Sequence, residues 1–157
     1  MTSPADSRRL SVAIIVRDSL EALRETLASV REFADEIVVL DTGSRVPPRE
    51  LAAQYGARLF EHPWDDDFSA ARNACLAHVT GDWILWLDAG ECLSRGDAQQ
   101  LREFVSQRAQ SQTAYLLLVR VPARGPRAAA EQVARIRLLP RHPRIQFRGR
   151  VRETVAE

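Results

Sequence analysis

The sequence predicts an α/β fold: a mainly parallel, doubly wound sheet with antiparallel strands added near the C-terminus. Over the first two-thirds of the chain, short apolar runs alternate with amphipathic helical segments, the pattern of successive strand–helix–strand crossovers. The run Trp83–Leu87 is apolar on both faces, as expected for a strand in the middle of a sheet that is covered on both sides.

The elements of the first crossovers follow from local patterns. Leu10–Arg17 is a short apolar run, predicted to be a buried strand. In the segment from Asp18 to Arg31, leucine and valine recur at steps of three and four residues, which predicts a helix that Asp18 or Ser19 can cap. Turn residues then bound a strand, a helix and a third strand at 36–40, 47–55 and 57–61.

The second half of the chain starts in the same way and then changes. Three aspartates at 65–67 precede a predicted helix at 68–79, where acidic side chains suit the positive end of the helix dipole. After Trp83–Leu87 we expect a helix at 94–108 and strands at 113–121, 133–139 and 145–147. The last strands have no helices between them, which indicates an antiparallel addition. We expect one domain over 10–157, with a flexible tail at 1–9.

Composition excludes several classes of protein. The chain has 157 residues, of which 45% are hydrophobic and 27% charged, as in one globular domain. All 22 basic residues are arginines, so no lysine is present for a Schiff base or a phosphate-binding loop. Cys75 and Cys92 are too far apart for a zinc-binding pair, and we expect reduced thiols in a cytoplasmic protein. No apolar run approaches the roughly 20 residues of a membrane-spanning helix.

Charge is divided unevenly along the chain, although the net charge is +1. Residues 1–111 carry 12 arginines against 18 acids, and residues 112–157 carry 10 arginines against 3 acids. The basic C-terminal third suits a phosphate-bearing substrate, peripheral contact with an anionic membrane, or simple solvation. The net charge near zero and the lack of a recognised module argue against nucleic-acid binding.

Acidic residues follow three of the predicted parallel strands, namely Asp18, Asp41 and Asp88. In doubly wound sheets, ligands bind outside the carboxyl ends of the strands. Carboxylates there suit hydrogen bonds to a sugar or base, or a hard divalent metal that carries phosphates. The alternative is a helix cap or a turn residue, above all for Asp18. No Gly-x-Gly-x-x-Gly follows the first strand, which argues against a dinucleotide-dependent oxidoreductase.

Four motifs occur in a characteristic order between about Ser11 and Leu93. They are Asp41-Thr42-Gly43-Ser44, Pro63-Trp64-Asp65-Asp66-Asp67-Phe68, Ala71-Arg72-Asn73, and Gly81-Asp82-Trp83 running on to Leu87-Asp88-Ala89-Gly90-Glu91. In these motifs the chain resembles the catalytic domain of family 2 glycosyltransferases, inverting enzymes of the GT-A fold that use nucleotide-diphospho-sugars. The segment from Phe147 to Glu153 resembles the closing segment of the same branch.

The resemblance implies a nucleotide-diphospho-sugar donor, an acceptor of unknown identity, and a role in cell-envelope or other glycan biosynthesis. The nucleotide-sugar-binding residues would be Asp18, Asp41, Arg72, Asn73 and Asp88. Asp41 would accept a hydrogen bond from the base, and Asp88 would meet the ribose and the metal. Glu153 would be the general base that deprotonates the acceptor hydroxyl.

The chain departs from the family pattern at four places. After the first strand the family has Asn-Glu, and this chain has Asp18-Ser19. After Asp-Thr-Gly-Ser the family has an aspartate, and this chain continues with Arg45-Val46-Pro47-Pro48. The family's Asp-x-Asp is Asp88-Ala89-Gly90 here, and its closing His-Glu is Arg152-Glu153. The glycine matters most, because Mg²⁺ or Mn²⁺ would bridge the phosphates of the donor. Either Glu91 joins Asp88 in holding the metal, or Arg152 pairs with the diphosphate without one.

The sequence is compatible with three functions. The first is sugar transfer with inversion, and the second is a non-catalytic nucleotide-sugar-binding or scaffolding domain that keeps the fold. The third, a nucleotidyltransferase-like enzyme, lacks the Gly/Arg-rich phosphate loop expected after the first strand. Because the chain ends four residues after Glu153, we expect a fragment or a minimal member of the family.

Overall fold

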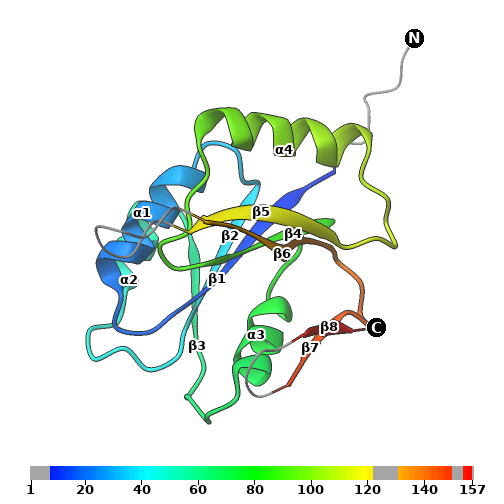
Figure 1. Cartoon of the computed structure of the whole chain (residues 1–157). Coiled ribbons are helices and arrows are strands. Elements are labelled where there is room, and N and C mark those ends of the chain that lie inside the picture. The colour runs from blue at the N-terminus through cyan, green and yellow to red at the C-terminus, as the bar shows by residue number, and fades with distance from the viewer. Residues whose placement is uncertain (1–7, 122–130, 150–153, 157) are drawn as a thin grey trace.

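The structure is a computed structural model that describes residues 8–121, 131–149 and 154–156 (Figure 1). Its described part contains a six-stranded sheet and a small two-stranded sheet. In chain order the elements are β1 (Leu10–Val16), α1 (Leu20–Val30), β2 (Glu36–Asp41), α2 (Arg49–Gln54), β3 (Arg58–Glu61), α3 (Phe68–Leu76), β4 (Trp83–Asp88), α4 (Arg95–Gln107), β5 (Tyr115–Val121), β6 (Glu131–Pro140), β7 (Gln146–Arg148) and β8 (Thr154–Ala156).

The large sheet has the strand order β3-β2-β1-β4-β6-β5. Its first four strands are parallel, whereas β6 is antiparallel to both β4 and β5. The chain winds from β1 out to β3 and then returns to place β4 on the other side of β1, so the winding direction reverses there. The predicted doubly wound sheet with antiparallel strands near the C-terminus is confirmed.

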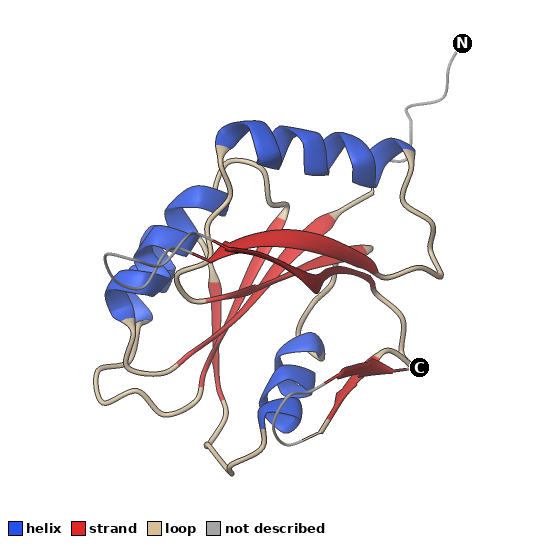
Figure 2. Cartoon of the chain, viewed as in Figure 1, coloured by secondary structure: helices blue, strands red, loops and turns tan. Residues whose placement is uncertain are grey.

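Helices cover the sheet on both faces (Figures 1 and 2). One core cluster joins α1, α2 and α4 to one face of the sheet, and a second joins α3 and β7 to the other. Strand β4 lies between β1 and β6, and Trp83–Leu87 is buried. Its two apolar faces therefore contact different layers, as the sequence predicted.

The observed elements lie within a few residues of the expected ranges, with three differences. Strand β8 pairs with β7 and has no counterpart among the expected strands. Ser19 takes the N-cap position of α1, but its side chain makes no capping hydrogen bond. Arg8 and Arg9, expected in the tail, contact the domain: Arg8 donates to the carbonyls of Val105 and Ala109, and the Arg9 amide donates to Asp82 at 2.8 Å.

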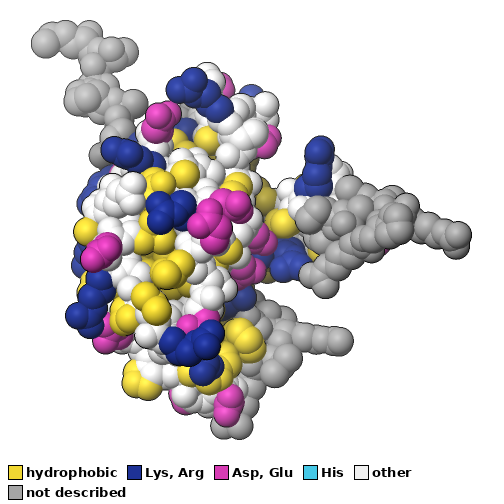
Figure 3. Space-filling view, turned by 90° about the vertical axis from the view of Figure 1, so that its left-hand side faces the viewer, with side chains coloured by type: hydrophobic (Ala, Val, Ile, Leu, Met, Phe, Trp, Pro, Cys, Tyr) yellow, Lys and Arg dark blue, Asp and Glu magenta, His cyan; other side chains and the backbone are white. Residues whose placement is uncertain are grey.

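Figure 3 shows the side of the molecule that lies on the left in Figure 1. Arginine and acidic side chains are interspersed on this face, with hydrophobic side chains between them, so no field of a single sign covers it. Within the described ranges, none of the helices is both long enough and apolar enough to cross a membrane.

Candidate functional site

The carboxyl ends of β2 and β4 flank the carboxyl end of β1. Asp41 is in register with Val16, and Asp88 is in register with Ile15. Two strand spacings, or about 10 Å, therefore separate the backbones of Asp41 and Asp88. Asp18 lies two residues beyond β1. The three predicted aspartates thus share one edge of the sheet, at the position where the winding reverses.

Asp41 and Asp18 fix the two turns that lie side by side at this edge. Oδ1 of Asp41 accepts hydrogen bonds from the amide and the hydroxyl of Ser44, at 2.9 and 2.7 Å. The Ser44 hydroxyl in turn accepts from the amide of Asp18 at 2.9 Å. Oδ1 of Asp18 accepts from the amide of Arg45 at 2.8 Å and from its Nε at 3.4 Å. The hydrogen bond from the Arg45 amide is the main cause that lowers the pKa of Asp18.

A second group of charges follows β4, and we call it the Asp88–Glu91 cluster: Asp88, Glu91, Arg72, Arg135 and Arg137. Asp88 lies 3.3 Å from Nη2 of Arg72, 2.8 Å from Nη2 of Arg137 and 3.9 Å from Nη1 of Arg135. Nη2 of Arg137 also donates to Oε1 of Glu91 at 2.7 Å. Oε2 of Glu91 accepts from the amide of Asp88 at 2.9 Å. One arginine nitrogen therefore lies between two carboxylates.

Helix α3 contributes Arg72 and Asn73 in different ways. The guanidinium of Arg72 lies 5.1 Å from the ring centroid of Trp86 and 5.2 Å from that of Phe147, within the range of cation–π attraction. Asn73 donates to the carbonyl of Phe147 at 2.9 Å and accepts from its amide at 2.8 Å. Asn73 thus links α3 to β7 through two hydrogen bonds. Its contact with a nucleotide stays a prediction.

The described residues do not fit a divalent metal ion as they stand. Both predicted ligands, Asp88 and Glu91, already accept from Arg137, which is only 4% exposed. No group of three or more His, Cys, Asp and Glu side chains suited to a metal occurs in the described parts of the chain. The predicted general base Glu153 and its neighbour Arg152 lie outside the described residues.

Arg135 and Arg137 were not among the predicted site residues. The available signal was two arginines at alternate positions of an otherwise apolar run, Val133–Leu139. Charges inside a strand that pairs with the central β4 need partners, and the acidic ends of neighbouring strands supply them. Their partners lie more than 40 residues away in sequence, so local pattern alone did not identify them.

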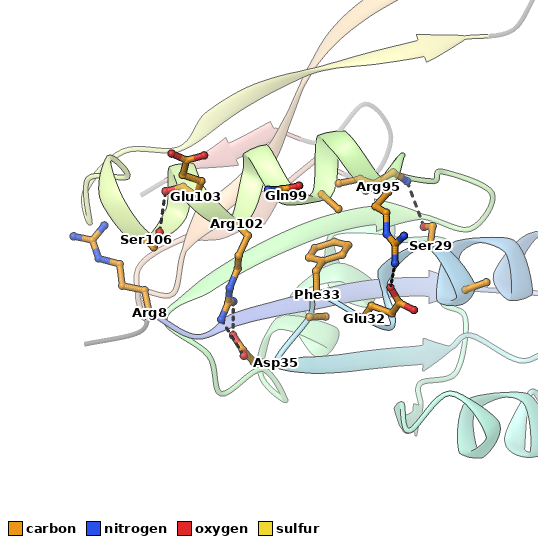
Figure 4. A pocket seen from close by; sticks show the side chains of 14 residues that line it. Arg8, Ser29, Glu32, Phe33, Asp35, Arg95, Gln99, Arg102, Glu103 and Ser106 are labelled. Atoms are coloured by element: carbon orange, nitrogen blue, oxygen red, sulfur yellow. Dashed lines mark hydrogen bonds and ion pairs between the residues drawn. The ribbon is translucent and has the colours of Figure 1, made fainter. Parts of the chain in front are cut away.

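Two large hollows border the domain, and one of them reaches the Asp88–Glu91 cluster. That hollow, of about 1010 Å³, is lined by Glu91, Arg135 and Arg137 and by apolar side chains of α4 and β5. The other, of about 1050 Å³, lies between α4 and the end of α1 (Figure 4). Charged side chains on its walls pair with one another, including Arg102 with Asp35 at 2.5 Å. Its lining runs along α4 from Arg8 and Asp35 to Leu93 and Arg95 and includes none of the three predicted aspartates.

The fold is thus an α/β sheet of the GT-A type with carboxylates and arginines at its switch point. The sequence matches the Glycosyl transferase family 2 description over residues 11–150, and the chain belongs to this family.

Proteins of several bacteria are similar to this chain in sequence. A TPR repeat-containing protein of Synechococcus elongatus is 48% identical over 99 residues, which cover 63% of this chain and 25% of that protein. The pre-mycofactocin glycosyltransferase of Mycobacterium tuberculosis is 31% identical over 97 residues, or 60% of this chain and 20% of that protein. The chain therefore spans about a quarter or less of these relatives.

Solved structures share the fold at low sequence identity. TarS of S. aureus (residues 1–349) aligns with a TM-score of 0.58 and 18% identity over 78% of this chain and 38% of that chain. The mannosyltransferase PcManGT of Pyrobaculum calidifontis, solved with GDP-Man and Mn²⁺, aligns with a TM-score of 0.58 and 20% identity, over 71% and 35% of the two chains.

Proposed function

We propose that this domain binds a nucleotide-diphospho-sugar at the carboxyl edge of the sheet and transfers the sugar, with inversion, to an acceptor hydroxyl. The observation that carries the proposal is the placement of Asp41 and Asp88 on either side of the end of β1 in a family 2 glycosyltransferase domain. Ligands of doubly wound sheets bind at this type of position.

The contacts of Asp41 support a role in reading the base. Its residue surface is only 3% exposed, and Ser44 holds one carboxylate oxygen through two hydrogen bonds. A carboxylate oriented in this way accepts hydrogen bonds from a base in a fixed geometry. Asp88, two strands away, would face the ribose, and Asp18 would border the same edge. Asn73 would act on the nucleotide through the segment that it holds at Phe147.

The proposed reaction forms one bond and breaks one. The acceptor oxygen attacks the anomeric carbon, the bond from that carbon to the diphosphate breaks, and the nucleoside diphosphate leaves with the bonding electrons. A general base takes the proton of the acceptor hydroxyl, and Glu153 is our candidate. Positive charge near the diphosphate offsets the charge that builds on it as the bond breaks. The arginines of the Asp88–Glu91 cluster lie at the edge where this charge is needed.

Titration calorimetry with UDP, GDP and their sugar derivatives tests donor binding. These probes follow from the neighbours, since TarS has been solved with UDP and PcManGT with GDP-Man and Mn²⁺. We expect one nucleotide series to bind with Kd between about 1 μM and 1 mM, and the matching nucleoside without phosphates to bind more weakly. If no nucleoside diphosphate binds in EDTA or in Mn²⁺, the proposal is wrong.

A specific observation favours a second candidate, a non-catalytic domain that binds the donor without turning it over. The cluster that follows β4 has lost the second aspartate of its motif to Gly90, and its two remaining carboxylates are paired with Arg137. Release of nucleoside diphosphate from a bound sugar donor separates the two candidates. Binding without release above the uncatalysed rate would favour the non-catalytic domain.

A further inference from the structure

We propose that the guanidinium of Arg137 takes the place of a divalent metal ion in this site, so that donor binding is independent of metal. This inference rests on the proposed function. Its basis is the position of one atom: Nη2 of Arg137 lies 2.8 Å from Asp88 and 2.7 Å from Glu91. These are the two carboxylates that the sequence offered as metal ligands, and the space between them already holds a cation.

The local backbone explains why Arg137 reaches this position. Strands β5 and β6 pair in register except at one point, where Tyr115 faces Leu138 and Leu116 faces Ile136. Arg137 is the residue that the pairing skips, so β6 bulges there. A bulge re-aims the side chain of the extra residue, and bulges are frequent beside active sites. The strand register therefore directs Arg137 toward the end of β4.

Burial makes the guanidinium difficult to displace. The side chain of Arg137 is only 5% exposed, and that of Glu91 is 18% exposed. A metal ion between Asp88 and Glu91 would remove the partners of a buried arginine, and an uncompensated buried charge is strongly unfavourable. Arg135 provides the contrast, since its side chain is 46% exposed and lies 3.9 Å from Asp88. Arg135 can turn into solvent at little cost.

The charge balance of the cluster does not need a metal. Asp88 and Glu91 contribute two negative charges, and Arg72, Arg135 and Arg137 contribute three positive ones, which leaves one net positive charge. Arginine binds phosphate oxygens through planar, charge-assisted hydrogen bonds. The chain itself therefore supplies positive charge for the diphosphate of the donor.

The backbone at Gly90 is consistent with a site built without a second aspartate. Its φ is +99°, a conformation that L side chains rarely adopt, and its amide donates to Thr26 Oγ1 at 2.8 Å. An aspartate would have to adopt this strained turn or break the hydrogen bond. The turn after β4 thus favours glycine at the position where the family motif has a carboxylate.

The first test uses Mn²⁺ alone, with no nucleotide. Arg137→Met removes the charge and keeps an unbranched side chain, and Arg135→Met is the matched control on the same strand. In EDTA, Arg137→Met should melt below the wild type, because Asp88 and Glu91 lose the guanidinium that they share. Added Mn²⁺ should raise its Tm and bind at least tenfold more tightly than it binds to the wild type or to Arg135→Met. Tight Mn²⁺ binding by the wild type, equal to that of Arg137→Met, would overturn the inference.

The second test compares wild-type protein in EDTA and in Mn²⁺ and needs no variant to fold. The Kd for the better of UDP and GDP should agree within about twofold in the two conditions. A gain of tenfold or more in Mn²⁺ would overturn the inference while leaving the proposed donor site intact. If neither nucleotide binds in either condition, the proposed function fails, and the Mn²⁺ titration still decides whether Arg137 takes the place of the metal.

Discussion

The parallel strands carry carboxylates at their amino ends, the amino edge, and at their carboxyl ends, the carboxyl edge, and the two sets are held differently. At the amino edge, Glu36, Asp35 and Asp82 each accept a hydrogen bond from a backbone amide of a neighbouring segment, and arginine side chains add to this at Glu36 and Asp35. At the carboxyl edge, the side chains of Arg72, Arg135 and Arg137 surround the carboxylate of Asp88. Backbone amides are fixed parts of the fold, whereas a guanidinium can exchange one anion for another. We therefore expect the amino edge to contribute mainly to stability and the carboxyl edge to ligand binding.

Glu36 links several segments of the amino edge through hydrogen bonds. Its carboxylate accepts from the Ser11 hydroxyl at 2.6 Å, from the amide and hydroxyl of Thr80 at 2.8 and 2.9 Å, and from Arg58 at 2.6 Å. Burial alone would raise its pKa, but the hydrogen bonds from Ser11 and Thr80 outweigh burial and lower the pKa to about 2. The start of β1, the start of β2 and the turn before β4 all meet at this group.

The largest effect is expected at Glu36. Its folded-state pKa lies below the value of 4.5 that is usual for glutamate, so the ionised form stabilises the fold above pH 4.5. This stabilisation is lost as the pH falls from about 4.5 to about 2. Glu36→Gln should lower the free energy of unfolding at pH 7 by about 3 kcal/mol. Urea denaturation measures the free energy of unfolding, and acidification should lower this free energy less in the variant than in the wild type.

The exposed Glu50 on α2 provides the control for this substitution. Glu50→Gln should change the free energy of unfolding by less than about 0.5 kcal/mol. Equal losses in the two variants would show that the amino edge has no special part in stability and would break the comparison.

The next largest effect concerns Gly81, also at the amino edge. A Cβ atom there would lie 2.4 Å from Ser11 Oγ and 3.0 Å from the carbonyl oxygen of Arg9. Gly81→Ala should therefore cost about 1–3 kcal/mol of stability. Gly96→Ala is the matched control, because its Cβ would meet only Ser94 Oγ at 3.9 Å and the position is helical. The control substitution should leave the stability unchanged or increase it. Thermal melts of the two variants and the wild type compare their stabilities.

A smaller change in stability and a clear change in binding are expected at Asp41. Asp41→Asn keeps an oxygen that accepts from Ser44 and removes the negative charge. We expect stability within about 1 kcal/mol of wild type and nucleotide affinity reduced about tenfold. Calorimetry with UDP and GDP measures the affinity. A folded variant with unchanged affinity would remove Asp41 from the site and would move the ligand-binding function away from this edge.

The sequence predicted the elements and the placement of Asp41 and Asp88 at the same edge of the sheet, because both depend on local periodicity and on strand direction. It did not predict the role of Arg137, because a one-residue bulge between β5 and β6 sets the direction of that side chain. Asn73 shows the same limit. Its side chain pairs with the backbone of Phe147, 74 residues away, a contact that the sequence did not predict, and its contact with a nucleotide stays a prediction. Contacts between distant segments follow from packing, which residue patterns do not specify.

The smallest effect is expected at Asp18, whose exposed carboxylate accepts from both a backbone amide and an arginine side chain. Its Oδ1 accepts from both the amide and the Nε of Arg45, and the amide is the main cause of the lowered pKa. Arg45→Ala removes the guanidinium and keeps the amide. The pKa of Asp18, followed by NMR titration of its carboxyl carbon, should therefore stay below the usual value of 3.8 in the variant. A return to 3.8 would mean that the exposed guanidinium controls this carboxylate. Asp18 would then resemble Asp88, which arginine side chains surround, rather than Asp82, whose carboxylate accepts from a backbone amide.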